Sequence, residues 1–171
     1  MTSRRPLDRL YDAAGYLAAL FLVGTLAMVL VGIAGRLLHF HVPGTDTYAG
    51  YCMAAAGFLA LAHTLKRGEH IRVTLIVERL GGANRRRLEL WALAAGVLLA
   101  ALFAWFSVRL AWQSYEFNDI STGNDATPLW IPQLAMAAGT LILLVALIDE
   151  LVLEIRGVRR PAAQAEPRFN E

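Results

Sequence analysis

Histidines and charged side chains are the residues of this chain that could do chemistry, and their positions restrict which chemistry is possible. Two histidines hold a haem only when their imidazoles lie at matching depth on facing helices. His39 and His41 lie near one end of the apolar segments, His63 and His70 lie near the other end, and the last two segments contain none. A haem site is therefore not predicted.

A charged residue deep inside an apolar segment would indicate a substrate path, because ionisable side chains within a membrane usually line transport routes. The middle of each segment lacks Asp, Glu, Lys and Arg, and Asp149 and Glu150 come only at the end of the fourth. The sequence also lacks a nucleotide-binding loop, a zinc motif and a nucleophile elbow. We therefore predict no enzyme activity, no cofactor, no catalytic or metal-binding residue, and no transport path within this chain alone.

The elements that position these residues are four uncharged segments, at 13–35, 47–65, 90–108 and 126–148. Each is close to the ~20 apolar residues that a helix needs to cross the hydrocarbon core. Because lipid cannot satisfy backbone polar groups, such runs must form helices. We expect an all-α integral membrane protein whose single domain covers 1–160, followed by a polar, disordered tail at 161–171. The expected spans are 13–38, 47–65, 88–112 and 129–153.

The basic residues predict how the chain is oriented. All but two of the 16 Lys and Arg residues fall on the side that holds both termini and the middle loop, and the exceptions are Arg36 and Arg109. The positive-inside rule then places both termini in the cytoplasm. The net charge is only +2, so the bases favour contact with the lipid bilayer and not with nucleic acid.

Two amphipathic stretches predict helices that lie at the membrane interface. One precedes the first span, and the other lies between the second and third spans. A simple charged leader is an equal alternative for the first stretch. The apolar residues at helical spacing are Leu7, Leu10, Tyr11 and Ala14 in the first, and Val73, Ile76, Val77 and Leu80 in the second.

Small residues recur at every fourth position of the third span, at Ala92, Gly96, Ala100 and Ala104. In lipid, small residues let helix backbones approach closely, so this stripe predicts a packing seam. The spacing does not decide whether a helix of this chain or of a partner fills the seam. A shorter seam is expected at Ala135 and Gly139.

The segment 113–128 is the longest between two spans on the outer side, and it is acidic. It contains Glu116, Asp119 and Asp125 and no Lys or Arg. It could serve as a docking surface, but a lack of bases is typical of any translocated loop.

One local motif resembles a known family. The sequence ALAHTLKRGEHIRV at 60–73 and the sequence PLWIP at 128–132 resemble the small permease of tripartite ATP-independent periplasmic (TRAP) transporters. The resemblance covers roughly residues 7–153. Two positions differ from the family pattern: Thr74 stands where an Asp is common, and Met136 falls where a second proline often opens the fourth helix.

This resemblance implies partners in a bacterial inner membrane. In such systems a periplasmic receptor captures a solute, usually an organic acid, and a large permease moves it with an ion gradient and without ATP. The small subunit would brace the large permease and could help to dock the receptor. The residues expected at the subunit contact or the membrane interface are Arg67, His70, Ile71, Val73, Ala92, Gly96, Ala100, Ala104, Trp130 and Pro132.

Two other functions fit a small four-span chain. It could be the membrane anchor of a redox or other peripheral enzyme, or a free-standing small exporter. The lack of paired histidines and of buried charges makes both less favoured than the transporter subunit.

Overall fold

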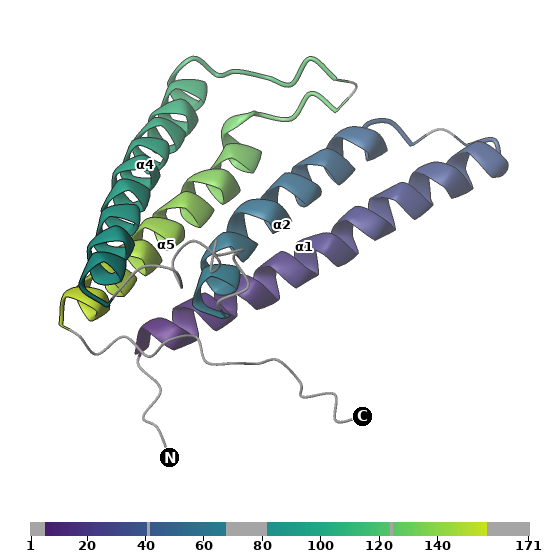
Figure 1. Cartoon of the computed structure of the whole chain (residues 1–171). Helices are drawn as coiled ribbons and strands as arrows, with labels where there is room; N and C mark the ends of the chain where they lie inside the picture. Colours follow the sequence, from purple (N-terminus) through teal and green to yellow (C-terminus); the bar gives the residue numbers. More distant parts are fainter. Residues whose placement is uncertain (1–5, 41, 68–81, 124, 157–171) are drawn as a thin grey trace, which may run out of the picture.

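The computed structural model describes residues 6–40, 42–67, 82–123 and 125–156, and its main elements are four long helices (Figure 1). They are α1 (Pro6–Leu37), α2 (Thr45–Arg67), α4 (Gly82–Glu116) and α5 (Trp130–Ile155). All four are long and apolar enough to cross a membrane. The expected all-helical membrane fold is therefore confirmed for the described residues.

Helices α2 and α4 extend beyond the expected spans at both ends, α1 begins before its expected span, and α5 ends after its expected span. The stretch expected as a separate helix before the first span is continuous with α1, which begins at Pro6. Tyr11 and Ala14 are buried in this stretch, and Tyr11 packs with Ala62 and Ala146. Contacts within the chain thus bury part of the apolar stripe, whereas Leu10 is exposed. The second expected interfacial helix, at 73–80, lies outside the described residues.

The helices form an open row in the order α1, α2, α5, α4 (Figure 1). Each of the hairpins α1–α2 and α4–α5 is held by direct packing, and α2 packs against α5 to join them. Helices α1 and α4 therefore lie at the two edges of the row. In a closed four-helix bundle these two helices would pack against each other.

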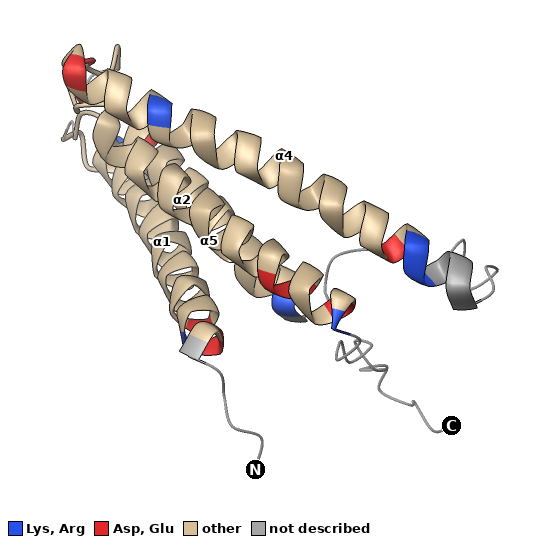
Figure 2. Cartoon of the chain, turned by 90° about the vertical axis from the view of Figure 1, so that its left-hand side faces the viewer, with Lys and Arg blue, Asp and Glu red and all other residues tan. Residues whose placement is uncertain are grey.

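Charged residues gather at the two ends of the row, and the helix surfaces between them are almost free of charge (Figure 2). We call the end where α1 begins and α5 finishes the terminal end. The opposite end carries the α1–α2 turn and the loop 117–129, and we call it the loop end. This distribution fits helices whose middle parts lie in hydrocarbon, since charges there are costly.

The α1–α2 hairpin is closed by glycines on α1 that face α2. A Cβ at Gly15 would lie 2.9 Å from the ring of His63, so the imidazole occupies the space that a side chain would need. Similar contacts occur further along the hairpin. Gly24 faces Cys52, and Gly32 faces Thr45. This seam was not among those expected from the sequence.

The α2–α5 contact has the closest backbone approach at a glycine. A Cβ at Gly139 would lie 2.6 Å from the carbonyl carbon and oxygen of Phe58. No side chain fits there unless the two helices move apart. Gly139 is therefore the residue that lets α2 and α5, and with them the two hairpins, meet.

We predict that Gly139→Ala destabilises the fold by about 1–3 kcal/mol, because the added methyl group overpacks a backbone contact. The measurement is thermal unfolding of the purified chain in detergent, followed by circular dichroism. Gly57→Ala is the matched control, since a Cβ at Gly57 meets no atom within 4 Å and alanine favours a helix. Equal unfolding temperatures for the two variants would contradict the prediction.

Candidate functional site

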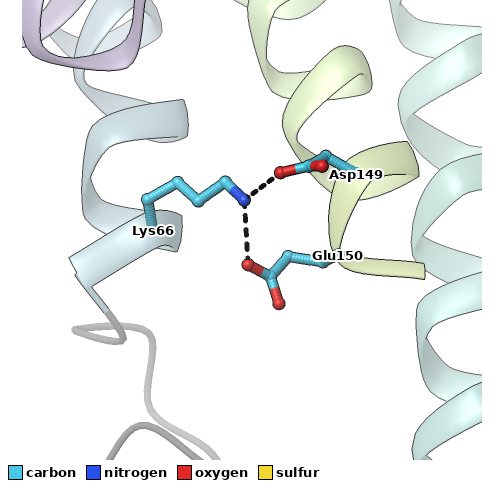
Figure 3. A network of polar contacts seen from close by, with 3 residues as sticks. All are labelled: Lys66, Asp149 and Glu150. Carbon is cyan, nitrogen blue, oxygen red and sulfur yellow. Dashed lines mark hydrogen bonds and ion pairs between the residues drawn. The ribbon is translucent and has the colours of Figure 1, made fainter. Parts of the chain in front are cut away.

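A polar cluster at the terminal end ties three helices together (Figure 3). Lys66 Nζ on α2 donates hydrogen bonds to Asp149 Oδ2 and, at 3.1 Å, to Glu150 Oε1 on α5. The Lys66 side chain is 17% exposed and the two carboxylates are each 15% exposed. Lys66 Nζ also lies 5.2 Å from the centre of the Tyr11 ring on α1, within the range of a cation–π contact. One ammonium group thus contacts α1 and α5 from α2.

His63 adds a second polar contact between α1 and α2 at this end. Its Nδ1 lies 3.3 Å from the backbone oxygen of Tyr11 and 3.7 Å from Asp12 Oδ1. Gly15 makes room for the imidazole. This histidine fits a role in helix packing, and it lies near the end of α2, as expected from the sequence.

At the loop end, the loop 117–129 folds back onto the start of α2. Ser121 Oγ donates a hydrogen bond of 2.8 Å to Asp125 Oδ1, and the Tyr51 hydroxyl donates one of 3.3 Å to Asp125 Oδ2. Thr127 Oγ1 bonds to the Tyr48 hydroxyl at 3.0 Å. We call this set of contacts the Asp125 latch. It joins the α4–α5 connection to α2.

One of the three acidic residues expected on this loop, Asp125, is held by hydrogen bonds in the latch. Desolvation acts to raise the pKa of the Asp125 carboxyl, but hydrogen bonds from Thr127 and Ser121 outweigh it and hold that pKa below its ordinary value. The Asp125 carboxylate therefore takes part in hydrogen bonds that hold the fold, whereas Glu116 and Asp119 are exposed. A docking surface on this loop would depend on the last two residues.

The structure separates the residues that the sequence grouped as contacts. Ala100 and Ala104 are buried within the chain on the helix that packs against α5, whereas Ala92 is exposed. Gly96 faces Leu147 of α5, with space for a Cβ at 3.7 Å. The buried line continues with residues that the expected ladder omitted: Ser107, Ala111 and Ser114. A helix of this chain, and not a partner, therefore fills the seam over Ala100 and Ala104.

The remaining candidates lie at helix ends or outside the described residues. Trp130 is the first residue of α5 and stacks edge-on against Tyr115 of α4 at 5.7 Å between ring centres. Pro132 lies in the first turn of α5, where its missing N–H costs no helical hydrogen bond. Arg67 is the last residue of α2. His70, Ile71 and Val73 lie outside the described residues.

The outer side of α4 carries an aromatic surface that was not among the contacts expected from the sequence. Trp91, Trp105, Phe106 and Trp112 are all exposed, between 57% and 77%. We call these four residues the α4 aromatic surface. This surface contains three of the four tryptophans in the chain. A seven-residue spacing of Trp91, Leu98, Trp105 and Trp112 could have revealed it, because i and i+7 share a helix face.

We predict that Lys66→Met destabilises the chain by about 1.5–3 kcal/mol, because Asp149 and Glu150 lose a charged hydrogen-bond donor in a mostly buried site. Thermal unfolding in detergent measures the loss. Arg87→Met is the control, since Arg87 is exposed. If both variants unfold at the same temperature, Lys66 does not link the helices energetically.

We predict that Asp125→Asn opens the latch at neutral pH, because the amide accepts hydrogen bonds more weakly than a carboxylate does. Faster hydrogen–deuterium exchange of residues 117–129 is the readout, with Asp119→Asn as the control. Because folding lowers the pKa of Asp125 from its ordinary value of 3.8, the wild-type latch should persist from pH 7 to about pH 4. Its stabilising effect should be lost only as the pH falls through the lower, folded-state pKa. Opening between pH 7 and 5 would contradict this assignment.

The comparison with known families agrees with this architecture. Residues 25–157 match the family described as the DctQ component of tripartite ATP-independent periplasmic transporters. The match includes all of α2, α4 and α5 and the later part of α1. No curated protein sequence matches the chain. The chain therefore belongs to the DctQ family, as the motif at 60–73 indicated, and is the small multi-pass membrane subunit of a tripartite ATP-independent periplasmic transporter.

Proposed function

We propose that this subunit braces the large permease of a secondary solute importer, and that the partner packs along α4. The observation that carries the proposal is the open row, which leaves α4 at an edge with its aromatic surface exposed. The subunit has its charges at the helix ends (Figure 2). The route for the solute would then lie in the large permease, and an ion gradient would drive the transport.

The two edges of the row differ in composition, and this favours α4 as the partner face. Edge helix α1 exposes mainly aliphatic side chains, including Leu20, Leu26 and Leu30. Aliphatic surfaces suit lipid tails, which give helices no hydrophobic reason to associate. Large aromatic side chains are typical anchors of protein interfaces. We infer that α4 meets the permease and that α1 faces lipid.

The loop end would face the periplasm if both termini are cytoplasmic, as the basic residues predict. The receptor could then dock near Glu116 and Asp119, which are exposed beside the latch. The solute is proposed to be an organic acid, by analogy with the family. These finer points rest on the family and on the charge distribution.

Substituting a matched pair of leucines tests which edge meets the permease. Leu98 on α4 is 62% exposed and Leu26 on α1 is 58% exposed, and both lie in the uncharged part of their span. Leu98→Trp should obstruct a protein interface, whereas a lipid-facing tryptophan at position 26 has room. We predict that Leu98→Trp lowers the amount of co-purified large permease about tenfold and that Leu26→Trp leaves it unchanged, as quantified by gel densitometry and solute uptake.

The reverse result would place the partner on α1. Wild-type co-purification with both variants would show that neither edge is the contact. Thermal unfolding of each variant alone serves as the folding control, because a fold defect lowers the unfolding temperature without the partner present.

A further inference from the structure

A cavity opens at the loop end between α1 and α2, away from the α4 edge. Its volume is about 500 Å³, within the ~300–1,000 Å³ range of small-molecule sites. Its apolar wall includes Val31, Phe40 and Val42, and its polar rim includes Arg36, His39 and Asp46. The cavity therefore combines an apolar wall with charges of both signs.

The cavity lies where the two spans of the α1–α2 hairpin end. The apolar part of α1 runs to Leu37 and that of α2 begins at Thr45. Val31 lies about 7.5 Å further along α1 from Arg36, toward the middle of the span, given the rise of a helix. An amphipathic molecule can thus reach the apolar wall from the membrane while its polar end stays at the rim. This depth corresponds to the headgroup layer.

The backbone shapes this opening. His39, just after the end of α1, has a positive φ of 56°, and the Phe40 N–H is bonded to the Gly35 oxygen at 3.0 Å. This is the arrangement of a Schellman motif, in which the chain turns sharply away from the helix axis. The turn brings His39 and Phe40 over the same space that Arg36 borders.

The ion pair between Arg36 and Asp46 on the rim is a single long contact between exposed side chains. A single atom of the Arg36 guanidinium, Nη2, lies 3.4 Å from Asp46 Oδ2, and the two side chains are 76% and 81% exposed. Exposed pairs of this kind contribute little to stability. A guanidinium has five N–H donors, so Arg36 can bind a phosphate and remain beside Asp46. His39 offers an imidazole N–H at the same rim in either protonation state.

We propose that this cavity binds one phospholipid with a zwitterionic ethanolamine headgroup. The lipid phosphate accepts hydrogen bonds from Arg36, and the ammonium group donates to the Asp46 carboxylate. The acyl chains continue along the apolar wall at Val31. A choline headgroup lacks N–H donors for Asp46, and a glycerol headgroup lacks the positive charge, so both fit less well.

The test measures lipid retention by the full-length chain. The chain is reconstituted in nanodiscs with equal amounts of phosphatidylethanolamine, phosphatidylcholine and phosphatidylglycerol, then released into detergent for native mass spectrometry. The wild-type chain should retain one phosphatidylethanolamine in preference to the other two lipids. Arg36→Gln should lower this retention about tenfold, the effect of losing one charge-assisted hydrogen bond. Arg109→Gln, which removes an exposed arginine on α4, should not change it.

Asp46→Asn gives an independent check that does not require the loss of binding. It removes the partner of the ammonium group and frees Arg36, so the preference should shift from phosphatidylethanolamine to phosphatidylglycerol. Retention of phosphatidylethanolamine by Arg36→Gln at the wild-type level would overturn the proposal. An unchanged lipid preference in Asp46→Asn, or no preference in the wild-type chain, would also overturn it.

Discussion

The contact between α2 and α5 is the constraint on which the rest of this structure depends. Each hairpin holds together by its own packing, and among the described helices α2 and α5 make the main contact between the two hairpins. Gly139 allows the α5 backbone to reach the Phe58 carbonyl, and Lys66 adds hydrogen bonds to α5 near the terminal end. Phe58 also reaches α4, where its ring lies 5.8 Å from that of Phe103. In lipid, hydrophobic burial does not drive helices together, so close van der Waals packing and polar contacts stabilise their association.

Closing the row at its centre has a consequence for its edges. Because α2 and α5 occupy the middle, α1 and α4 each keep an outer surface with many large apolar side chains exposed. Such surfaces are stable only against lipid or another protein. The chain is thus built as a partial structure, which suits a subunit of a larger membrane assembly. The exposed side chains of α4 include several large aromatic rings, whereas those of α1 are mainly aliphatic.

Polar side chains act at the ends of this row. At the terminal end, Lys66 links α2 to α5 and contacts Tyr11 of α1; at the loop end, Asp125 links the α4–α5 connection to α2. Both sets of contacts cross between hairpins, so they reinforce the central contact from its two ends. The helix segments between them are almost free of charged residues (Figure 2). Such contacts suit the bracing role proposed for this subunit, whereas a transporter that works alone would need ionisable groups along a path.

The sequence by itself determined the helical class, the number of spans and their approximate positions, because hydrocarbon excludes charge from each span separately. It also indicated the family through the local motif at 60–73. Only the tertiary structure decided the open row, the partners of Lys66 and Asp125, and which small residues form seams. Of the small residues expected to form one packing stripe on the third span, Ala100 is buried and Ala92 is exposed. The close contact at Gly15 was not expected from the sequence. The physical reason is that lipid-facing and helix-facing surfaces are equally apolar, so hydropathy does not distinguish them, and helix pairing depends on shape and on a few polar contacts between distant residues.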